Sequence, residues 1–261
     1  MAPAFEKVLV GIQEGVATVT INNPQQKNAL DHDLHAELQQ AFGYLRDEEE
    51  AKVVVLTGAG DNFCTGGNLV KMQAIANSVV GRQRMKWTQR LVEGISGLEK
   101  PVIAMIRGIA LGAGMSLALA ADVSIAAEDA RLMCSFSKIG LVPDWGQFYL
   151  LPSRVGLARA KWLMLTGAEL SGAEAVRLGL IALAVPGQRL EQEAYGLARS
   201  LAQGPCQAYA MIKAALNCWP SNFQAMLEME AAMQGIAFCS QDHAAARQAF
   251  IDSKKHGTKR A

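Results

Sequence analysis

Two glycine-rich segments, each preceded by a run of apolar residues, are the first candidates for chemistry. They are residues 63–69 (Phe-Cys-Thr-Gly-Gly-Asn-Leu) and residues 108–114 (Gly-Ile-Ala-Leu-Gly-Ala-Gly). Glycine frees a turn to point backbone N–H groups at an approaching oxygen, and the N-terminus of a following helix adds a favourable dipole. Two such loops could aim two hydrogen-bond donors at one carbonyl oxygen. Alternatively, both segments are tight packing turns.

The glycines do not form a nucleotide-binding motif. Residues 57–63 begin like a dinucleotide fingerprint but have Phe63 where the third glycine belongs. Residues 112–117 likewise have Leu117 at the position of the third glycine. Neither segment has the Lys-Ser/Thr pair of a phosphate-binding P-loop. Nucleotide binding of the Rossmann type is therefore not expected.

Asp144 is the acidic residue with the most distinctive surroundings. It lies between Pro143 and Trp145 in an apolar stretch. A carboxylate in such surroundings has a raised pKa and can act as a base near neutral pH. The alternative is a simple Pro-Asp-Trp-Gly turn in which Asp144 caps the next helix.

Histidine and cysteine give no pattern for a metal site or a disulfide. His32 and His35 lie three residues apart on a helix expected at the surface, and His243 and His256 lie near the C-terminus. No third ligand accompanies them, so no metal is expected. The cysteines never form a CxxC pair, which is typical of structural thiols in a reducing compartment. They are Cys64, Cys134, Cys206, Cys218 and Cys239.

Composition excludes several classes of protein. The chain is 51% apolar with a net charge of +1, so a large core is possible and a disordered chain is excluded. No basic run provides a surface for nucleic acid.

Residues 101–121 are mostly apolar, but Arg107 and three glycines interrupt them, so no membrane span is expected. Because Glu6 and Lys7 precede any apolar run, we expect no secretory signal and a cytoplasmic protein.

Apolar periodicity predicts strands that alternate with helices, which is typical of parallel β/α units. Val8, Val10 and Ile12 alternate with polar residues before a turn, so residues 8–21 are predicted to form a hairpin. Asp31 is predicted to cap a helix. The apolar face of that helix would be Leu34, Leu38, Ala41, Phe42 and Leu45. Further strands are predicted at residues 53–56, 102–106 and 123–126, and further helices at 87–98 and 112–121.

The second part of the chain is predicted to be helical. Helical patterns cover residues 189–202, 206–217, 222–238 and 241–254, and Ser171 with Glu174 matches a capping box. The predicted organisation is therefore an α/β core over residues 1–190 and a helical C-terminal region over 191–261.

On these motifs the chain resembles the enoyl-CoA hydratase/isomerase (crotonase) family from about Val8 to Lys254. Residues 23–30 (Asn-Pro-Gln-Gln-Lys-Asn-Ala-Leu) resemble the family's early motif, and the two glycine loops resemble its oxyanion segments. The resemblance implies an α/β fold, the crotonase (ClpP-like) spiral of ββα units with a helical C-terminal trimerisation region. It also implies an acyl-CoA thioester substrate and a homotrimer or a hexamer. Coenzyme A would enter only as part of that substrate, with no tightly bound cofactor.

The resemblance assigns roles to particular residues. The N–H groups of Gly67 and Ala113 would bind the thioester oxygen. The coenzyme A contacts would come from Lys27, Asn28, Ala29, Leu30, Gly66, Asn68 and Leu69. Three positions depart from the family's usual residues. Asn68 replaces an aspartate, Gln147 a glycine and Ser253 a lysine, whose contact Lys254 or Lys255 would take over.

The residues at the positions of the family's catalytic acids indicate which reaction of the family to expect. The two catalytic glutamates of the hydratases correspond here to Ser116 and Phe136, which cannot exchange protons as glutamates do. Residues 135–144 are instead similar to the ring-epoxide phenylacetyl-CoA isomerases and related enoyl-CoA isomerases of fatty-acid and phenylacetate catabolism. In those enzymes a single aspartate at the Asp144 position is the acid/base. The dehalogenases of the family also have this aspartate, but their helper histidine corresponds here to Gln89.

The expected activity is therefore a double-bond shift, with Asp144 as acid/base and the oxyanion donors holding a thioester enolate. Trp87, Ser116, Phe136 and Trp145 would line the acyl pocket, and the wall formed by Phe136 and Trp145 suits a flat or aromatic acyl group. Two alternatives remain open at this point: a hydratase or lyase of the same family, and a non-catalytic acyl-CoA-binding protein.

Overall fold

A six-stranded sheet forms the centre of the computed structural model, which describes residues 5–70, 77–219 and 222–248. The strand order is β1-β2-β3-β4-β6-β9, with β1 antiparallel to β2 and every other pair parallel. The strands are β1 (Val8–Gln13), β2 (Val16–Ile21), β3 (Val53–Gly58), β4 (Val102–Ile106), β6 (Val123–Ala127) and β9 (Leu183–Val185). The predicted hairpin and the three predicted inner strands are confirmed.

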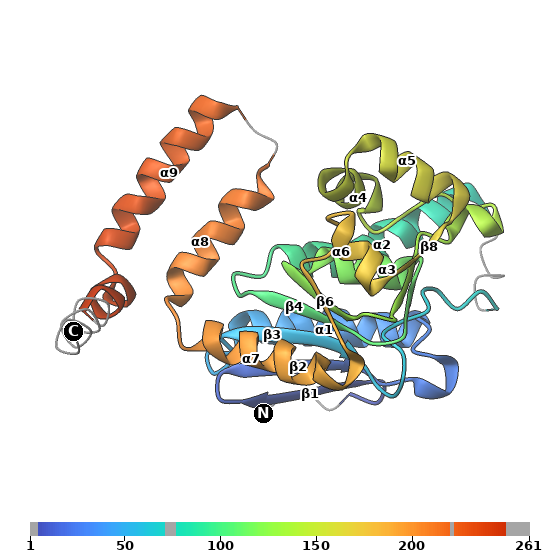
Figure 1. The fold of residues 1–261 in the computed structure, drawn as a ribbon, viewed down its shortest axis with the longest axis horizontal. Coiled ribbons are helices and arrows are strands. Elements are labelled where there is room, and N and C mark those ends of the chain that lie inside the picture. The colour runs from blue at the N-terminus through green and yellow to red at the C-terminus, as the bar shows by residue number, and fades with distance from the viewer. Residues whose placement is uncertain (1–4, 71–76, 220–221, 249–261) are drawn as a thin grey trace.

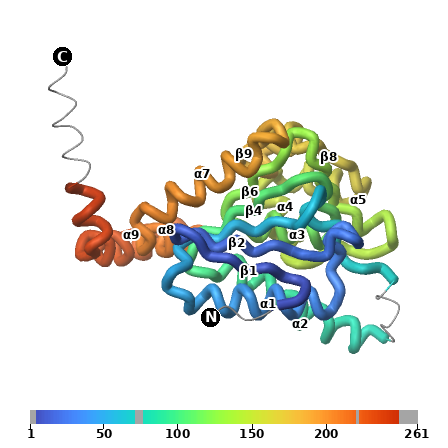
Figure 2. Tube along the Cα trace, turned by 90° about the horizontal axis from the view of Figure 1, so that it is seen from below, coloured from blue at the N-terminus to red at the C-terminus, as the bar shows by residue number. Residues whose placement is uncertain are grey.

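The inner strands are apolar on both faces because helices cover both sides of the sheet. In β3 and β4 every residue from Val53 to Leu56 and from Val102 to Ile106 is buried. Figure 2 shows α1 (His32–Asp47) on one face and α7 (Leu190–Ala202) on the other. The predicted apolar face of α1 is wholly buried, and the Asp31 carboxylate accepts a hydrogen bond from the Leu34 N–H (2.9 Å), as a helix cap.

A second, three-stranded sheet is absent from the sequence-based predictions. It has the order β5-β7-β8 and comprises β5 (Ile109–Leu111), β7 (Arg131–Met133) and β8 (Glu169–Ser171). Strands of three residues are too short to show a clear alternation, which explains why the sequence did not reveal them. This sheet matters for the site because β5 leads directly into α3 (Ala113–Ala120), through the second glycine loop.

Further helices complete the fold up to α7. They are α2 (Ser78–Ser96), α4 (Gln147–Val155), α5 (Leu157–Thr166) and α6 (Gly172–Arg177), with short 3₁₀ helices η1 (Pro24–Gln26), η3 (Phe136–Ile139) and η4 (Gly187–Arg189). The capping box of Ser171 and Glu174 is confirmed. Helix α2 begins at Ser78 rather than at 87, because Asn77 caps a first half that is largely exposed and shows no apolar periodicity.

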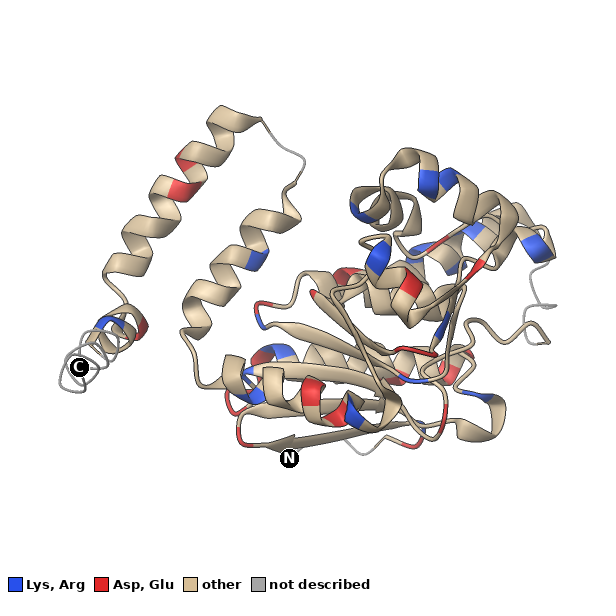
Figure 3. Cartoon of the chain, in the orientation of Figure 1, with Lys and Arg blue, Asp and Glu red and all other residues tan. Residues whose placement is uncertain are grey.

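The C-terminal helices α8 (Cys206–Asn217) and α9 (Phe223–Phe238) extend away from the rest of the molecule (Figure 1). Lys213 attaches α8 to the core: its buried Nζ lies 2.7 Å from Asp122 Oδ2 and also donates to two backbone carbonyls. Helix α9 buries none of its side chains. Both helices carry few charged residues (Figure 3) and expose large apolar side chains.

The helical predictions are confirmed as far as Gln248, where the described residues end. The predicted division of the chain at residue 190 stays a prediction, although α7 lies beyond it and packs on the central sheet. No helix in the described part of the chain has both the length and the apolar character to cross a membrane.

Candidate active site

The two glycine loops lie against each other. The Cys64 N–H donates to the Ile109 carbonyl (2.9 Å), and the Leu111 N–H donates to the Cys64 carbonyl (3.0 Å). A Cβ added to Gly114 would lie 2.2 Å from the Cys64 carbonyl oxygen, closer than any side chain can approach. Glycine is thus required where the two backbones meet, and the two segments form one rigid unit.

This contact leaves two backbone donors unpaired. Ala113 is the first residue of α3, so its N–H lies at the positive end of that helix. A Cβ added to Gly66 would lie 3.2 Å from the Ala113 nitrogen, which shows how closely the first loop approaches it. Among the hydrogen bonds of the described residues, neither the Gly67 nor the Ala113 N–H has a protein acceptor. Both are free to bind an oxygen of a ligand.

Both donors belong to the wall of a cavity of about 710 Å³, which lies between α1, α2, the two loops and the segment from η3 to Trp145. Most residues assigned from the sequence line it, and these are Ala29, Leu30, Gly66, Gly67, Asn68, Leu69, Trp87, Ala113, Phe136, Asp144 and Trp145. Lys27, Asn28 and Ser116 do not line it.

Asn28 and Lys27 instead support the first loop from behind. The buried Asn28 amide donates to the carbonyls of Ala59 (3.0 Å) and Asn62 (2.6 Å). The Lys27 carbonyl accepts from the Thr65 N–H (3.2 Å). In the structure this motif therefore holds the glycine loop in position, while its later residues reach the cavity. Contact of all these residues with coenzyme A stays a prediction.

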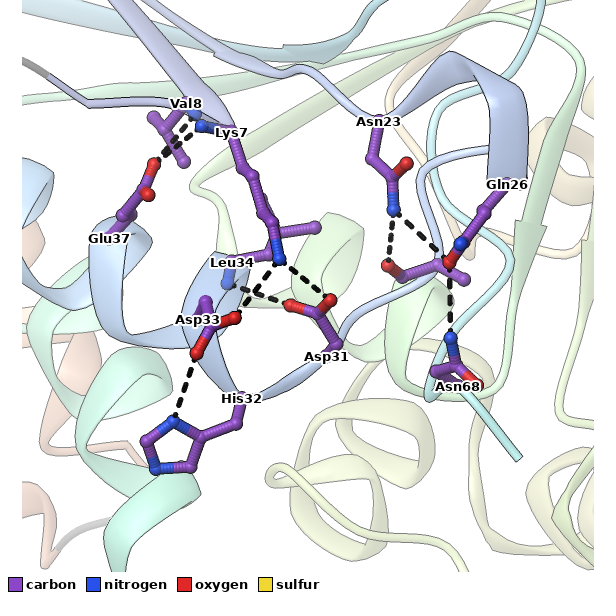
Figure 4. Close-up of polar contacts among 11 residues, drawn as sticks. Lys7, Val8, Asn23, Gln26, Asp31, His32, Asp33, Leu34, Glu37 and Asn68 are labelled. Carbon is purple, nitrogen blue, oxygen red and sulfur yellow. Dashed lines mark hydrogen bonds and ion pairs between the residues drawn. The ribbon is translucent and has the colours of Figure 1, made fainter. Parts of the chain in front are cut away.

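Polar side chains at the cavity also bind one another (Figure 4). The Asn68 amide donates to Gln26 Oε1 (3.1 Å), and the Asp31 carboxylate pairs with Lys7 Nζ (2.8 Å) while it caps α1. Asp31 is the second carboxylate of the cavity wall, and these contacts hold it in a structural role. Ser253 and the lysines after it lie outside the described residues.

Asp144 has no such partners. It follows η3 and precedes α4, and its Oδ1 is buried without a hydrogen-bond partner among the described residues. Burial raises the pKa of the Asp144 carboxyl from 3.8 to about 7. The alternative that Asp144 caps α4 is wrong, because the cap residue is Gly146 and no side chain bonds to the helix start. Ser116 lies beneath, where its hydroxyl donates to the Asp144 backbone carbonyl (3.1 Å).

Aromatic rings cover the side of the cavity next to Asp144. Trp145 has a left-handed backbone (φ 52°), which is strained for a bulky residue, and its ring is buried. His35 packs edge-on against it, with 5.0 Å between ring centroids, and lies 4.4 Å from the Trp87 ring, on which His32 is stacked. Trp145, next to Asp144 in the chain, is thus buried in this cluster of rings, and burial is the cause of the raised pKa of the Asp144 carboxyl.

His35 is a residue of the cavity wall that the sequence-based prediction misplaced. It was expected at the surface, but it is only 2% exposed, because it shares the buried stripe of α1 with Leu34 and Leu38. Its Nε2 lies 3.0 Å from the Thr88 carbonyl, and desolvation lowers the pKa of the ring to about 4. The ring is therefore neutral at physiological pH. Its spacing of three residues from Leu38 was the signal for burial.

Comparison with known proteins identifies the family to which this site belongs. The family model of the enoyl-CoA hydratases/isomerases matches residues 11–259. The chain belongs to the enoyl-CoA hydratase/isomerase family. It is 38% identical to the "Probable enoyl-CoA hydratase" of Rhodobacter capsulatus, over 96% of this chain and 97% of that protein. It is 35% identical to the 1,2-epoxyphenylacetyl-CoA isomerase of Escherichia coli, over 95% of this chain and 96% of that one.

Solved structures of the family confirm the predicted crotonase fold. The crystal structure of an enoyl-CoA hydratase/isomerase from Cupriavidus metallidurans superposes with a TM-score of 0.91 at 36% identity, covering 97% of this chain and 96% of that chain. The enoyl-CoA hydratase/isomerase assignment is thus supported by both sequence and fold. Members named hydratase and members named isomerase occur at similar identity, so the family alone does not decide between the two reactions.

Proposed function

We propose that this member of the family is an enoyl-CoA isomerase, which shifts a double bond in the acyl group of a coenzyme A thioester. One observation carries the proposal. The Asp144 carboxyl, unpartnered at Oδ1 and with a pKa raised to about 7, shares a cavity with the free N–H groups of Gly67 and Ala113. A carboxyl with this pKa both accepts and returns a proton near neutral pH.

In the proposed reaction the thioester oxygen accepts hydrogen bonds from Gly67 and Ala113. Asp144 removes a proton from a carbon of the acyl chain, and the electron pair moves towards the thioester oxygen as an enolate forms. The protonated Asp144 then delivers the same proton to a different carbon, so the double bond moves and no atom is gained or lost. Loss of one preorganised donor of this kind costs about 3 kcal/mol in the barrier. Coenzyme A enters only as part of the substrate.

The residues at the two glutamate positions favour a single acid/base. The Ser116 hydroxyl is buried and hydrogen-bonded to the backbone carbonyls of Gly112 and Asp144, so it faces no substrate. Phe136 is buried in the cavity wall and has no proton to exchange. Hydration normally needs one group to activate water and another to protonate carbon, and these positions supply neither.

The aromatic wall indicates the kind of acyl group. Trp87, Phe136 and Trp145 present flat apolar surfaces to the cavity, and aromatic rings pack favourably on such surfaces. We propose that the preferred acyl group is unsaturated and flat, or carries a ring. The name of the Escherichia coli relative, a 1,2-epoxyphenylacetyl-CoA isomerase, agrees with this preference.

Proton NMR of 3-hexenoyl-CoA in D₂O, repeated with 2-hexenoyl-CoA, tests the proposal. The expected result is conversion of the 3-enoyl to the 2-enoyl thioester without a 3-hydroxyacyl product, and near-complete loss of turnover in Asp144→Asn with acyl-CoA affinity retained. Formation of the 3-hydroxyacyl thioester would show a hydratase instead. Binding without turnover of either thioester, or of aromatic acyl-CoA esters, would show a binding protein.

A further inference from the structure

The peptide group that carries the Ala113 donor is itself hydrogen-bonded at its other end. The Gly112 carbonyl and the Ala113 N–H belong to one planar peptide group. That carbonyl accepts from the Ser116 N–H (3.0 Å) and from the side-chain amide of Gln147 (3.4 Å). The Ser116 hydroxyl also lies 3.3 Å from it, and its one proton is shared with the Asp144 carbonyl (3.1 Å). Gln147 is fully buried at the start of α4, so this contact is shielded from water.

A second buried contact holds the Gln147 amide in one orientation. The Cys134 thiol donates to Gln147 Oε1 (2.8 Å), which leaves Nε2 directed at the Gly112 carbonyl. Burial raises the pKa of the Cys134 thiol to about 12, so the thiol keeps its proton and remains a donor. A flipped amide would place Oε1 against the Gly112 carbonyl oxygen, and the two acceptors would repel each other. The orientation is therefore determined by the contacts on both sides.

Hydrogen bonds to a carbonyl strengthen the N–H of the same peptide as a donor, because a chain of hydrogen bonds polarises cooperatively in a low-dielectric interior. They also immobilise the plane of the peptide, so that the N–H direction is set before the substrate binds. Preorganised donors of this kind are the ones that stabilise a developing oxyanion most strongly.

We propose that Gln147, held by Cys134, is a positioning residue of the oxyanion hole, which acts on the substrate carbonyl through the Gly112–Ala113 peptide. This inference rests on the proposed role of the Ala113 N–H.

Infrared difference spectroscopy of bound hexanoyl-CoA, labelled with ¹³C at the thioester carbonyl, measures the strength of the oxyanion hole without turnover. In the wild type we expect the carbonyl stretch to move to lower frequency on binding. In Gln147→Met, which keeps the length of the side chain but has no donor, we expect a smaller shift. We also expect kcat to fall roughly fivefold to tenfold, as for the loss of one hydrogen bond, with KM unchanged.

Two further variants separate positioning from general damage to the fold. Cys134→Ser keeps a donor to Gln147 and should retain the wild-type carbonyl shift, whereas Cys134→Ala should lose part of it. Phe148→Ala, at an exposed neighbour on α4, should match the wild type. An unchanged carbonyl shift and unchanged kcat in Gln147→Met would overturn the inference. Absence of any shift in the wild type would overturn the proposed oxyanion hole and this inference with it.

Discussion

Replacing Asp144 with asparagine should raise stability and abolish turnover at the same time. The pKa of the Asp144 carboxyl is raised from 3.8 to about 7 by burial, which means that the folded protein binds this proton more tightly than the unfolded chain does. A difference of about 3 pKa units corresponds to about 4 kcal/mol at 1.36 kcal/mol per unit. The ionised carboxylate thus lowers the free energy of unfolding by about that amount at pH 8.

The contribution of Asp144 to the free energy of unfolding depends on pH. Because the folded-state pKa is the higher one, the contribution of Asp144 to stability is fully present below about pH 4 and is lost as the pH rises through about 7. Asparagine has the same shape and does not titrate. We therefore expect Asp144→Asn and the wild type to unfold at similar urea concentrations at pH 4, and the variant to be more stable at pH 8.

Urea unfolding of both proteins at several pH values measures this difference, with Asp129→Asn, at an exposed carboxylate, as the matched control. In the wild type, kcat/KM should rise with pH with an apparent pKa of about 7, because only the ionised carboxylate accepts a proton. A stability difference that is the same at pH 4 and pH 8 would refute the reasoning about burial. A flat pH–rate profile across pH 5 to 9 would refute the role of Asp144 as base.

Three further outcomes are expected. Lys213→Met removes the ion-pair partner of Asp122, whose side chain is 27% exposed and keeps the Val102 N–H as a donor. The free energy of unfolding should therefore fall by about 1.5–3 kcal/mol in urea titrations, and adding Asp122→Asn should restore part of it. No recovery would contradict the pairing. In Gly114→Ala the new Cβ would collide with the Cys64 carbonyl and separate the two loops, so kcat should fall about 100-fold. The control variant Gly94→Ala adds a Cβ where there is open space, and it should leave kcat unchanged. Because α9 buries no side chain within one chain, we expect the protein to self-associate. The resemblance to the family implies trimers or dimers of trimers, which sedimentation equilibrium would detect, and a monomer would contradict this.

Local sequence determined most of the elements and the candidates for chemistry. The hairpin, the cap at Asp31, the capping box at Ser171 and the C-terminal helices all depend on residues close together in the chain, and the structure confirms them. The glycine loops and Asp144 were also recognisable, because glycine in a turn and a carboxylate among apolar residues are local patterns.

Contacts between distant residues were decided only by the tertiary structure. The sequence could not show that the Gly67 and Ala113 N–H groups are free at one cavity, since that depends on pairing between residues 64 and 109–111. The burial of His35 and the Cys134–Gln147–Gly112 contacts are of the same kind. The pKa of Asp144 likewise depends on desolvation by groups that the fold packs around the carboxyl. Local propensity acts over a few residues, whereas desolvation and hydrogen bonding act between atoms that only the folded chain brings together.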